Sequence, residues 1–287
     1  MHKLLSKFIL VKKKRFKVLC GNNNIMKILL FGSTGMLGNY VFRVLSEKHD
    51  VACVVRSSFD IENDNWQKLK ELVLQSDCDI IINCAGVIPQ KKGNTDFSTF
   101  IRVNSLFPHK LQEYALQYKK QFIHITTDCV FDGKTGNYTS TDSHTADDLY
   151  GITKSLGELD DATVIRTSII GEEKYGKKSL LEWIKSNKNG SIKGYTNHYW
   201  NGVTCLTLAR IINQMIDTKM FWKGVKHVFS PDVVSKYDLC CYINKIYNLN
   251  ITIEKYEAIV SKNMTLAGDI LFLINPIYEQ INELLLF

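Results

Sequence analysis

The sequence has no apolar run that approaches the ~18 to 20 residues needed to span a bilayer, so we expect no transmembrane helix. Proline is scarce, with 4 residues in 287, and neither an internal repeat nor a low-complexity linker is present. Hydrophobic residues at 45% and charged residues at 23% are typical of a globular chain. The length therefore suits one large domain, or one domain with a smaller lobe closely connected to it.

The eight cysteines form no CxxC pair and no repeated spacing of the kind that binds metals. Cys53, Cys84 and Cys129 lie in or at the ends of apolar runs, where a thiol usually acts as a small hydrophobic side chain. We therefore expect no metal site and a reducing, cytoplasmic location.

Acidic residues are absent from residues 1–25, which carry seven of the 36 lysines and arginines. The remainder is neutral, with 29 basic and 29 acidic residues, so we expect no nucleic-acid-binding surface on the folded body. A signal peptide is a poor interpretation, because the apolar stretch is short, contains Lys7 and is followed by KKKR. We predict that residues 1–25 are a disordered basic extension, and translation from Met26 is the alternative.

From Met26 the chain alternates short apolar runs with longer amphipathic segments, which is the pattern of βαβ units and a parallel sheet. The predicted strands are residues 27–32, 50–56, 79–86, 121–127 and 163–168, and the predicted helices are 37–47, 65–76, 104–118 and 148–160. This predicts an α/β fold, with a Rossmann-type doubly wound parallel sheet over residues 26–170.

Beyond about Gly171 the alternation weakens. Helices are predicted at residues 179–187, 207–217 and 236–248, with short strand candidates at 225–230 and 251–256 between them. We interpret residues 171–287 mainly as a smaller substrate-binding lobe, within which residues 204–217 could pack back on the sheet.

The stretch FGSTGMLG, which begins within the first predicted strand, places glycines at every third position. Glycines between a strand and a helix let the backbone turn tightly, admit a phosphate close to its amides and let the helix pack closely. The spacing is GxxGxxG and not the GxGxxG of the dinucleotide fingerprint, so a plain strand-to-helix turn is the alternative.

The second predicted strand ends at Arg56, about 20 residues beyond the glycines. In dinucleotide folds an acidic residue at such a position binds the ribose 2′-hydroxyl, whereas a nearby arginine accommodates a 2′-phosphate. Arg56 therefore favours NADP over NAD, and a solvated arginine after a strand is the ordinary alternative.

Tyr150 and Lys154 lie four residues apart, so on a helix their side chains share one face. An adjacent ammonium favours the phenolate and lowers the pKa of a tyrosine toward the range useful for proton exchange. Thr126, Thr127 and Asp128 end the fourth strand, where the hydroxyls could bind a carbonyl oxygen or cap the next turn. Taken singly, each pattern also occurs by chance.

The order of these motifs is their most specific property. GxxGxxG follows the first strand, an arginine the second, NCAG the third and Thr-Thr-Asp the fourth, and YxxxK opens the next helix. In this order the chain resembles the extended short-chain dehydrogenase/reductase family, and within it the dTDP-4-dehydrorhamnose reductases and related nucleotide-sugar 4-keto reductases. The resemblance is specific from Met26 to about Ser168 and looser beyond.

The resemblance implies roles for individual residues. Thr127 would polarise the sugar ketone, Tyr150 would donate the proton, and Lys154 would lower the pKa of Tyr150 and bind the nicotinamide ribose. The implied cofactor-binding residues are Gly32, Ser33, Thr34, Gly35, Met36, Leu37, Arg56, Asp60, Ile61, Cys84, Ala85, Gly86, Tyr150 and Lys154. The implied substrate-binding residues are Asn104, Thr127 and Asp128.

Two departures from the family pattern bear on the substrate. Dehydratases of the family carry Asp-Glu after the catalytic threonine, where this chain has Asp128 and Cys129, so dehydration is not implied. The loop at residues 195–202, YTNHYWNG, differs from the usual one, and its candidate substrate-binding residues are Tyr199, Trp200 and Asn201. Its aromatic rings could stack on a sugar or a base, and a core or lid-packing role for Trp200 is the alternative.

These observations predict an NADPH-dependent reductase that acts on the 4-keto group of a nucleotide-linked 4-keto-6-deoxyhexose in deoxysugar biosynthesis, with NAD(H) as the alternative cofactor. The substrate is either the dTDP-linked precursor of rhamnose or a UDP-2-acetamido-2,6-dideoxy-L-hexos-4-ulose, which the altered loop slightly favours. A 4-epimerase with bound NAD and a non-catalytic NADP-binding regulatory subunit are the competing functions. A homodimer is left open.

Overall fold

The structure of the protein is a computed structural model that describes residues 25–89, 96–174, 178–268 and 270–287. The predicted basic extension, residues 1–25, lies outside the described residues except for Ile25.

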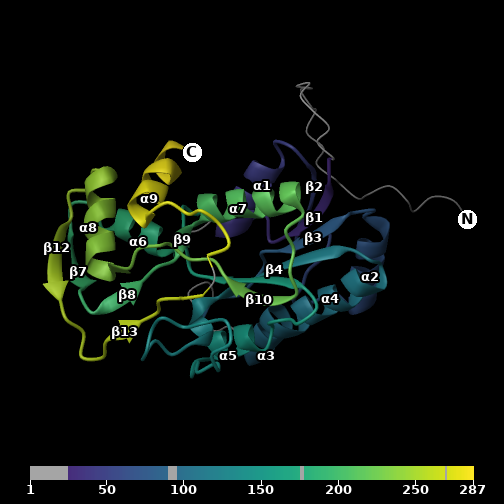
Figure 1. Ribbon diagram of the computed structural model, residues 1–287, viewed down its shortest axis with the longest axis horizontal. Coiled ribbons are helices and arrows are strands. Elements are labelled where there is room, and N and C mark those ends of the chain that lie inside the picture. The colour runs from purple at the N-terminus through teal and green to yellow at the C-terminus, as the bar shows by residue number, and fades with distance from the viewer. Residues whose placement is uncertain (1–24, 90–95, 175–177, 269) are drawn as a thin grey trace, which may run out of the picture.

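The centre of the molecule is a six-stranded sheet with the strand order β10-β5-β4-β3-β1-β2 (Figure 1). Its strands are β1 (Lys27–Phe31), β2 (Asp50–Val54), β3 (Ile80–Asn83), β4 (Gln121–Thr127), β5 (Thr163–Thr167) and β10 (Gly224–His227). All neighbouring strands pair in parallel. The chain leaves β1 toward β2 and then continues on the other side with β3, so the sheet is doubly wound and the predicted Rossmann-type fold is confirmed.

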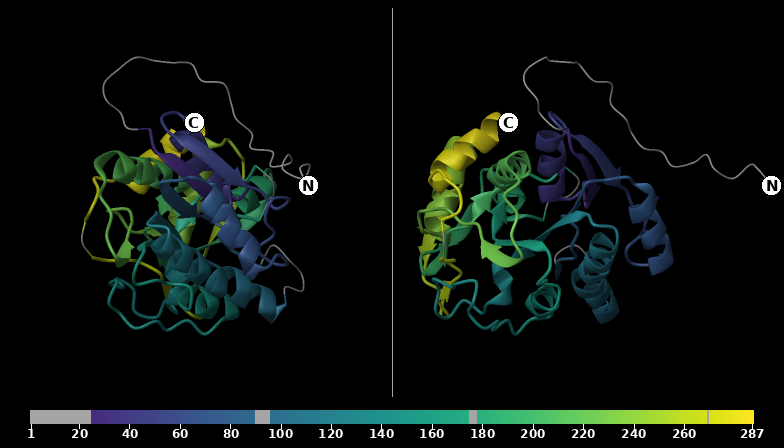
Figure 2. Two further views of the ribbon diagram at one scale, coloured as in Figure 1. Left: turned by 90° about the vertical axis from the view of Figure 1, so that its right-hand side faces the viewer. Right: turned by 45° about the vertical axis from the view of Figure 1, so that its right-hand side comes forward.

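Helices cover both faces of this sheet. They include α1 (Met36–Leu45), α2 (Trp66–Gln75), α4 (Phe107–Gln117) and α7 (Cys205–Thr218). Successive residues of a strand point to opposite faces, so Ile28 and Leu30 join the core beneath α1 and α7, and Leu29 and Phe31 join the core beneath α2 and α4. Figure 2 shows these helical layers on either side of the sheet.

Two segments from the range 171–287 belong to this central layer. Helix α7 packs against α1. Strand β10, within the range assigned to the lobe from sequence, instead extends the central sheet by pairing with β5 from Gly224 to His227. The apolar pattern at residues 225–230 identified a strand, but the sheet that it joins depends on contacts with residues about 60 positions earlier.

Shorter helices connect the later strands of the sheet. Helix α3 (Phe97–Phe100) and a π-helical segment (Ile101–Leu106) precede α4, and a 3₁₀ turn (Asp128–Val130) and α5 (Leu149–Ser155) follow β4.

The remaining elements form the C-terminal part of the molecule. They are β6 (Ile169–Ile170), α6 (Leu180–Ser186), β7 (Ser191–Tyr195), β8 (His198–Trp200), β9 (Val203–Thr204), β11 (Val234–Ser235), α8 (Lys236–Ile246), β12 (Thr252–Tyr256), β13 (Lys262–Asn263) and α9 (Ile277–Leu286). The strands pair in three small sheets, in the orders β11-β8-β13, β12-β7 and β6-β9.

A buried ion pair joins the central sheet to the segment after α5. Arg166 on β5 is 1% exposed and donates from Nε and Nη2 to the two carboxylate oxygens of Glu158, at 2.9 and 2.5 Å. Its Nη1 lies 2.9 Å from Nε2 of His227 on β10. Burial alone would raise the pKa of Glu158, but hydrogen bonds from His144 and Arg166 hold it at about 2.

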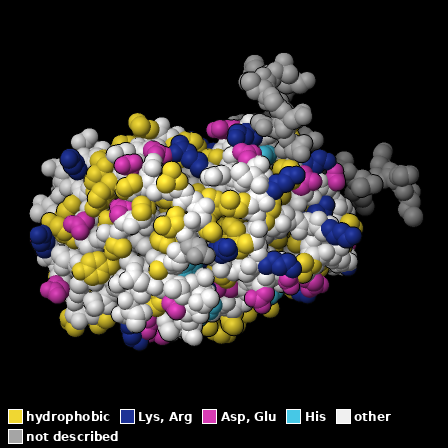
Figure 3. All heavy atoms as spheres, viewed as in Figure 1, with side chains coloured by type: hydrophobic (Ala, Val, Ile, Leu, Met, Phe, Trp, Pro, Cys, Tyr) yellow, Lys and Arg dark blue, Asp and Glu magenta, His cyan; other side chains and the backbone are white. Residues whose placement is uncertain are grey.

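None of the described helices has the length and apolar character needed to cross a membrane. Within the described ranges, histidine, cysteine, aspartate and glutamate side chains form no group that could hold a metal ion. The cysteines at positions 53, 78, 84, 129, 205, 240 and 241 are free thiols. On the face in Figure 3, basic and acidic side chains lie interspersed.

Candidate active site

The glycine-rich turn joins β1 to α1 at the carboxyl edge of the sheet. Gly32 has a φ of +79°, and a Cβ there would lie 2.6 Å from the backbone nitrogen of Ala85, so the loop after β3 leaves room only for glycine. A Cβ on Gly38 would lie 2.1 Å from the Gly32 carbonyl oxygen, so α1 packs directly on the turn. The Gly35 amide closes the turn by donating to the same oxygen, at 2.9 Å.

The N-terminus of α1 is built to hold an anion. Its N-cap is Gly35, which has no side chain to accept from the amides of the first turn. These amides carry the positive end of the helix dipole, and Gly35, Met36 and Leu37 all line a cavity at the carboxyl edge of the sheet. A dinucleotide pyrophosphate fits this cradle, because phosphate oxygens supply the acceptors that the turn lacks.

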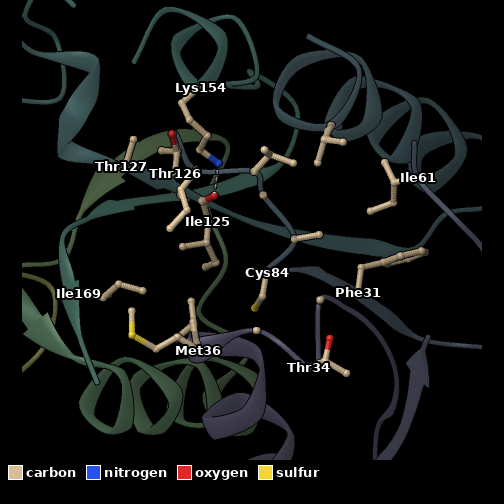
Figure 4. Close-up of a pocket in the computed structure, with 18 of the residues that line it drawn as sticks. Phe31, Thr34, Met36, Ile61, Cys84, Ile125, Thr126, Thr127, Lys154 and Ile169 are labelled. Carbon is tan, nitrogen blue, oxygen red and sulfur yellow. Dashed lines mark hydrogen bonds between the residues drawn. The ribbon is translucent and has the colours of Figure 1, made fainter. Parts of the chain in front are cut away.

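The cavity has a volume of about 630 Å³ and runs along the carboxyl ends of the central strands (Figure 4). Thr34, Phe31 and Ile61 lie toward one end, and Thr126, Thr127 and Lys154 lie toward the other (Figure 4). Of the predicted cofactor-binding residues, the structure brings the following to its wall: Gly32, Thr34, Gly35, Met36, Leu37, Arg56, Asp60, Ile61, Cys84, Ala85, Gly86, Tyr150 and Lys154. Ser33 is not among the described residues that line it.

The loop after β2 forms the end of the cavity where an adenosine would lie. Arg56 pairs there with Asp60 and Glu62, at 3.1 and 3.2 Å. The Ile61 carbonyl accepts from Nε of Arg102 at 2.7 Å, which fixes the loop against the π-helical segment.

Thr127, Tyr150 and Lys154 meet at the opposite end of the cavity. Thr127 is the last residue of β4. Helix α5 begins at Leu149 because the side chain of Asp148 caps it by accepting from the Gly151 amide at 2.7 Å. The four-residue spacing then places Tyr150 and Lys154 on one face of α5.

Lys154 is buried beneath this end of the cavity. Its Nζ donates to the carbonyl oxygen of Ile125 at 2.9 Å (Figure 4). Burial lowers the pKa of Lys154 to about 8, against the opposing influence of Glu158. The pKa of the Lys154 ammonium therefore lies close to neutral pH.

Tyr150 keeps its proton at neutral pH. Burial raises the pKa of Tyr150, Cys129 acts in the same direction, and a hydrogen bond with Thr127 opposes them. The sequence analysis expected this pKa to be lowered, whereas burial raises it in the folded protein. A protonated phenol beside a threonine hydroxyl is arranged to donate hydrogen bonds to an oxygen atom in the cavity.

The residues beside Thr127 add polar groups to the same wall. Asp128 is 3% exposed, and burial raises the pKa of its carboxyl although Ser168 and Lys236 lower it. The hydroxyl of Thr126 is buried with no hydrogen-bond partner among the described residues. An orphaned hydroxyl in a cavity wall suits a polar ligand atom.

Asn104 lies behind the cavity wall rather than on it. Its side chain accepts from the Val87 amide at 2.9 Å and donates to the Val87 carbonyl at 3.0 Å. Val87 lines the cavity, so Asn104 shapes the wall through the loop that it holds.

The three candidates in the loop at residues 195–202 do not reach the described cavity wall. Trp200 is 4% exposed and belongs to the main core. Asn201 is also buried, and its amide bonds both the amide and the carbonyl of Leu266, at 2.9 and 2.8 Å. Tyr199 is 43% exposed. The sequence showed an unusual loop but not the neighbouring strands β11 and β13 that pair with it.

Other wall residues escaped the sequence analysis, among them Phe59, Glu62, Ser168 and Ile169. A signal for two of them was present, because Ser168 ends the fifth predicted strand and Ile169 directly follows it. The side chain of Lys236, at the start of α8, had no sequence signal. Burial lowers the pKa of Lys236 and Asp128 opposes this, which places a cation from the C-terminal part near the cavity.

Curated proteins resemble this chain over most of its length. A dTDP-4-dehydrorhamnose reductase of Aggregatibacter actinomycetemcomitans is 26% identical over 232 residues, which cover 76% of this chain and 78% of that protein. The methionine adenosyltransferase 2 subunit beta of Mus musculus is 25% identical over 248 residues, which cover 78% and 72%.

Two solved structures share the fold. One is the dTDP-4-dehydrorhamnose reductase of Bacillus anthracis in complex with NADP, with a TM-score of 0.78 and 18% identity over 91% of this chain and 99% of that one. The other is WbmG of Bordetella bronchiseptica in complex with NAD and UDP, with a TM-score of 0.71 and 12% identity over 92% and 94%.

The family model described as the RmlD substrate binding domain matches residues 26–267. It thus covers the whole sheet, the cavity and most of the C-terminal part. The resemblance predicted from the motifs is confirmed, and the chain belongs to the RmlD substrate binding domain family.

Proposed function

We propose that this protein is an NADPH-dependent reductase of the 4-keto group of a nucleotide-linked 4-keto-6-deoxyhexose. The observation that carries the proposal is the convergence of Thr127 and Tyr150 on the cavity that begins at the glycine-rich turn. A ketone in this cavity would lie within reach of two hydroxyl donors. The family membership and the similarity to the dTDP-4-dehydrorhamnose reductase of Aggregatibacter actinomycetemcomitans support the same reaction.

The residues of the chain would divide the work along the cavity. A bound nicotinamide supplies the hydride that reduces the sugar carbonyl carbon. Thr127 donates a hydrogen bond to the carbonyl oxygen, and Tyr150, which is protonated at neutral pH, transfers its proton to that oxygen as it gains charge. Lys154 anchors the nicotinamide ribose. The balance is one hydride, one proton and one ketone, which give one alcohol and the oxidised cofactor, and Tyr150 recovers its proton from solvent.

The cofactor is NADP(H), with NAD(H) as the alternative. The glycine-rich cradle would bind the pyrophosphate, and the loop of Arg56, Asp60 and Ile61 would bind the adenosine. NADP in the Bacillus anthracis structure and NAD in the Bordetella bronchiseptica structure support both forms on this fold.

The nucleotide of the substrate is dTDP or UDP. The reductase among the relatives supports dTDP, and the UDP in WbmG supports the other on the same fold. The earlier preference for UDP rested on the loop at residues 195–202, and the core position of Trp200 weakens it.

A non-catalytic regulatory subunit is the second candidate, because the methionine adenosyltransferase subunit beta matches 78% of this chain. A 4-epimerase is a third candidate from the same fold. It would keep its cofactor and consume none, whereas a reductase consumes one NADPH for each ketone reduced.

The test is the loss of NADPH absorbance when the purified full-length protein meets dTDP-4-keto-6-deoxy-L-mannose or its UDP-linked 2-acetamido counterparts. Turnover with one of these sugars supports a reductase and names the nucleotide. Dinucleotide binding without turnover on any of them would overturn the proposed reaction and favour a regulatory subunit. Conversion of the sugar without NADPH consumption would favour an epimerase.

A further inference from the structure

The hydroxyl of Thr127 makes three hydrogen bonds within the protein. It accepts from the backbone amide of Cys129 at 3.2 Å, and it is hydrogen-bonded to Tyr150, whose phenol keeps its proton at neutral pH. Its oxygen also lies 3.1 Å from Oδ1 of Asp128. A hydroxyl has one proton and two acceptor lone pairs. The amide and the phenol occupy the two lone pairs, so the one proton of Thr127 is directed at Asp128.

The proposed reaction needs that same proton, because it has Thr127 donate a hydrogen bond to the carbonyl oxygen of the sugar. An ionised carboxylate only accepts hydrogen bonds, and a bond to a charged acceptor is about twice as strong as a bond to a neutral one. Ionised Asp128 therefore competes with the ketone for the proton of Thr127. A protonated carboxyl group can instead donate to Thr127 and removes this competition.

Groups from several elements surround the carboxyl group of Asp128, which is buried and lines the cavity. The thiol of Cys129 donates to Oδ1 at 3.6 Å, and burial raises the pKa of this thiol to about 12, so it stays a donor. Ser168 after β5 forms a further hydrogen bond, Lys236 on α8 favours the ionised form, and Tyr150 on α5 lies nearby. Burial outweighs these groups and raises the pKa of Asp128 above its ordinary value.

We propose that Asp128 is a positioning residue that acts through Thr127. As a carboxylate it retains the proton of Thr127, and as a carboxylic acid it donates to Thr127 and releases that proton to the ketone. When Tyr150 also turns to the ketone, Thr127 accepts from the Cys129 amide and from the acid, so each of these donors has an acceptor. Asp128 keeps its proton throughout the reduction, so the stoichiometry is unchanged. The inference rests on the proposed function, because it describes two states of the same site.

The first experiment measures kcat/KM at saturating NADPH between pH 5 and pH 7.5, with the full chain and dTDP-4-keto-6-deoxy-L-mannose, or the UDP-linked sugar if only that one is reduced. This window lies below the pKa of Lys154, about 8, so Lys154 keeps its proton. In the unchanged protein kcat/KM should fall about tenfold as the pH rises and Asp128 ionises, the scale of one hydrogen bond.

Asp128→Asn should remove this fall, because an asparagine carries no charge and its amide can donate to Thr127 as the acid does. At pH 7.5 the variant should therefore be about tenfold faster than the unchanged protein. Asp161→Asn is the matched control, since it neutralises an exposed carboxylate that pairs with Lys223 and does not line the cavity. It should keep the pH profile of the unchanged protein. Circular dichroism establishes that each variant is folded.

A double-mutant cycle tests whether Asp128 acts through Thr127. Thr127→Val should lower kcat/KM about 10²-fold, the scale of one lost donor to the developing oxyanion. In that background Asp128→Asn should change kcat/KM by less than about twofold at either pH. A larger change would mean that Asp128 acts on the substrate directly, and it would overturn the proposal.

The second experiment needs neither sugar nor cofactor. The carboxyl ¹³C resonance of Asp128, assigned by its absence in Asp128→Asn, is titrated in protein labelled at aspartate. Its pKa should lie above the ordinary value and should rise further in Thr127→Val, because the carboxylate loses a donor.

The same fall of kcat/KM in Asp128→Asn and in the unchanged protein would overturn the proposal, as would equal rates of the two at pH 7.5. Failure of the proposed reaction is a different outcome, in which no sugar is reduced at any pH. The titration then decides by itself whether Thr127 donates to Asp128. An Asp128 titration that Thr127→Val leaves unchanged would overturn the proposal in either case.

Discussion

The strands of the central sheet and those of the C-terminal part differ in burial and in length. Every residue of β3 and of β5 is buried, because helices cover both faces of the sheet. In β12, three of the five residues are exposed, and several strands of the C-terminal part span two residues. The sheet is thus specified by continuous apolar runs, and the C-terminal part by contacts between short segments.

The cavity follows the same division. Among the described residues that line it, Glu173 alone lies in the range 171–287. The groups proposed to bind the cofactor and to move the proton therefore come from the loops after the central strands, as expected for a doubly wound fold. The C-terminal part contributes nearby support, such as Lys236 near Asp128, rather than the cavity wall itself.

The largest effect should come from the phenol at the end of the central sheet. Tyr150→Phe should lower kcat by about 10³-fold, the scale of a lost general acid, and leave NADPH binding nearly unchanged. Steady-state kinetics and NADPH titration measure the two effects. Tyr256→Phe, on β12 of the C-terminal part, is the control and should turn over normally. Full activity in Tyr150→Phe would refute the assigned proton donor.

Two glycines compare the turn after β1 with the start of β10, the edge strand of the same sheet. Gly32 and Gly224 both have a φ of +79°, but a Cβ on Gly32 meets the Ala85 nitrogen at 2.6 Å, whereas a Cβ on Gly224 has nothing within 4 Å. Gly224→Ala should therefore cost about 1 kcal/mol of unfolding free energy, the cost of the backbone conformation. Gly32→Ala should cost about 3 kcal/mol or more and weaken NADPH binding.

Urea unfolding, followed by circular dichroism, gives both values. Equal losses in the two variants would show that the loop after β3 yields to the new methyl group, so that close approach does not fix this turn.

Much of the fold and of the cofactor end of the site could be predicted from the sequence. Strands such as β3 are recognisable as apolar runs. The carboxyl ends of parallel strands lie at one edge of the sheet, so Gly32, Thr127 and Tyr150 could be assigned to one site. The same reasoning failed where the decisive neighbour is distant in sequence. Nothing local shows that Trp200 is buried against the core or that β10 belongs to the central sheet.

Charge pairing was equally invisible in the sequence. Arg56 alone predicted a phosphate site, but the conformation of the following loop determines that Asp60 and Glu62 turn back toward it. Chain positions four and six residues away gave no indication of that conformation.

A pH experiment tests the buried contact between β5 and β10 at the edge of the central sheet. Burial, with Arg166 nearby, lowers the pKa of His227 to about 4 from the ordinary value of about 6.5. Between these values the unfolded chain binds a proton that the folded chain does not, so stability falls as the pH falls through this window. His227 alone should remove about 2 kcal/mol of unfolding free energy between pH 7.5 and pH 5.

In His227→Gln this part of the pH dependence should disappear, and in His109→Gln, which changes an exposed histidine, it should remain. Urea midpoints at the two pH values measure it. An undiminished pH dependence in His227→Gln would show that the buried contact between β5 and β10 does not sense protons.

The smallest effect should come from Tyr199, the one exposed aromatic side chain among the three loop candidates. Because Tyr199 is 43% exposed and does not line the cavity, Tyr199→Ala should change the unfolding free energy by less than about 0.5 kcal/mol. Its KM for the nucleotide sugar should stay within about twofold, since a lost aromatic stack would cost more. A KM raised severalfold with unchanged stability would instead mean that this loop closes on the substrate, and that the C-terminal part shares in recognition after all.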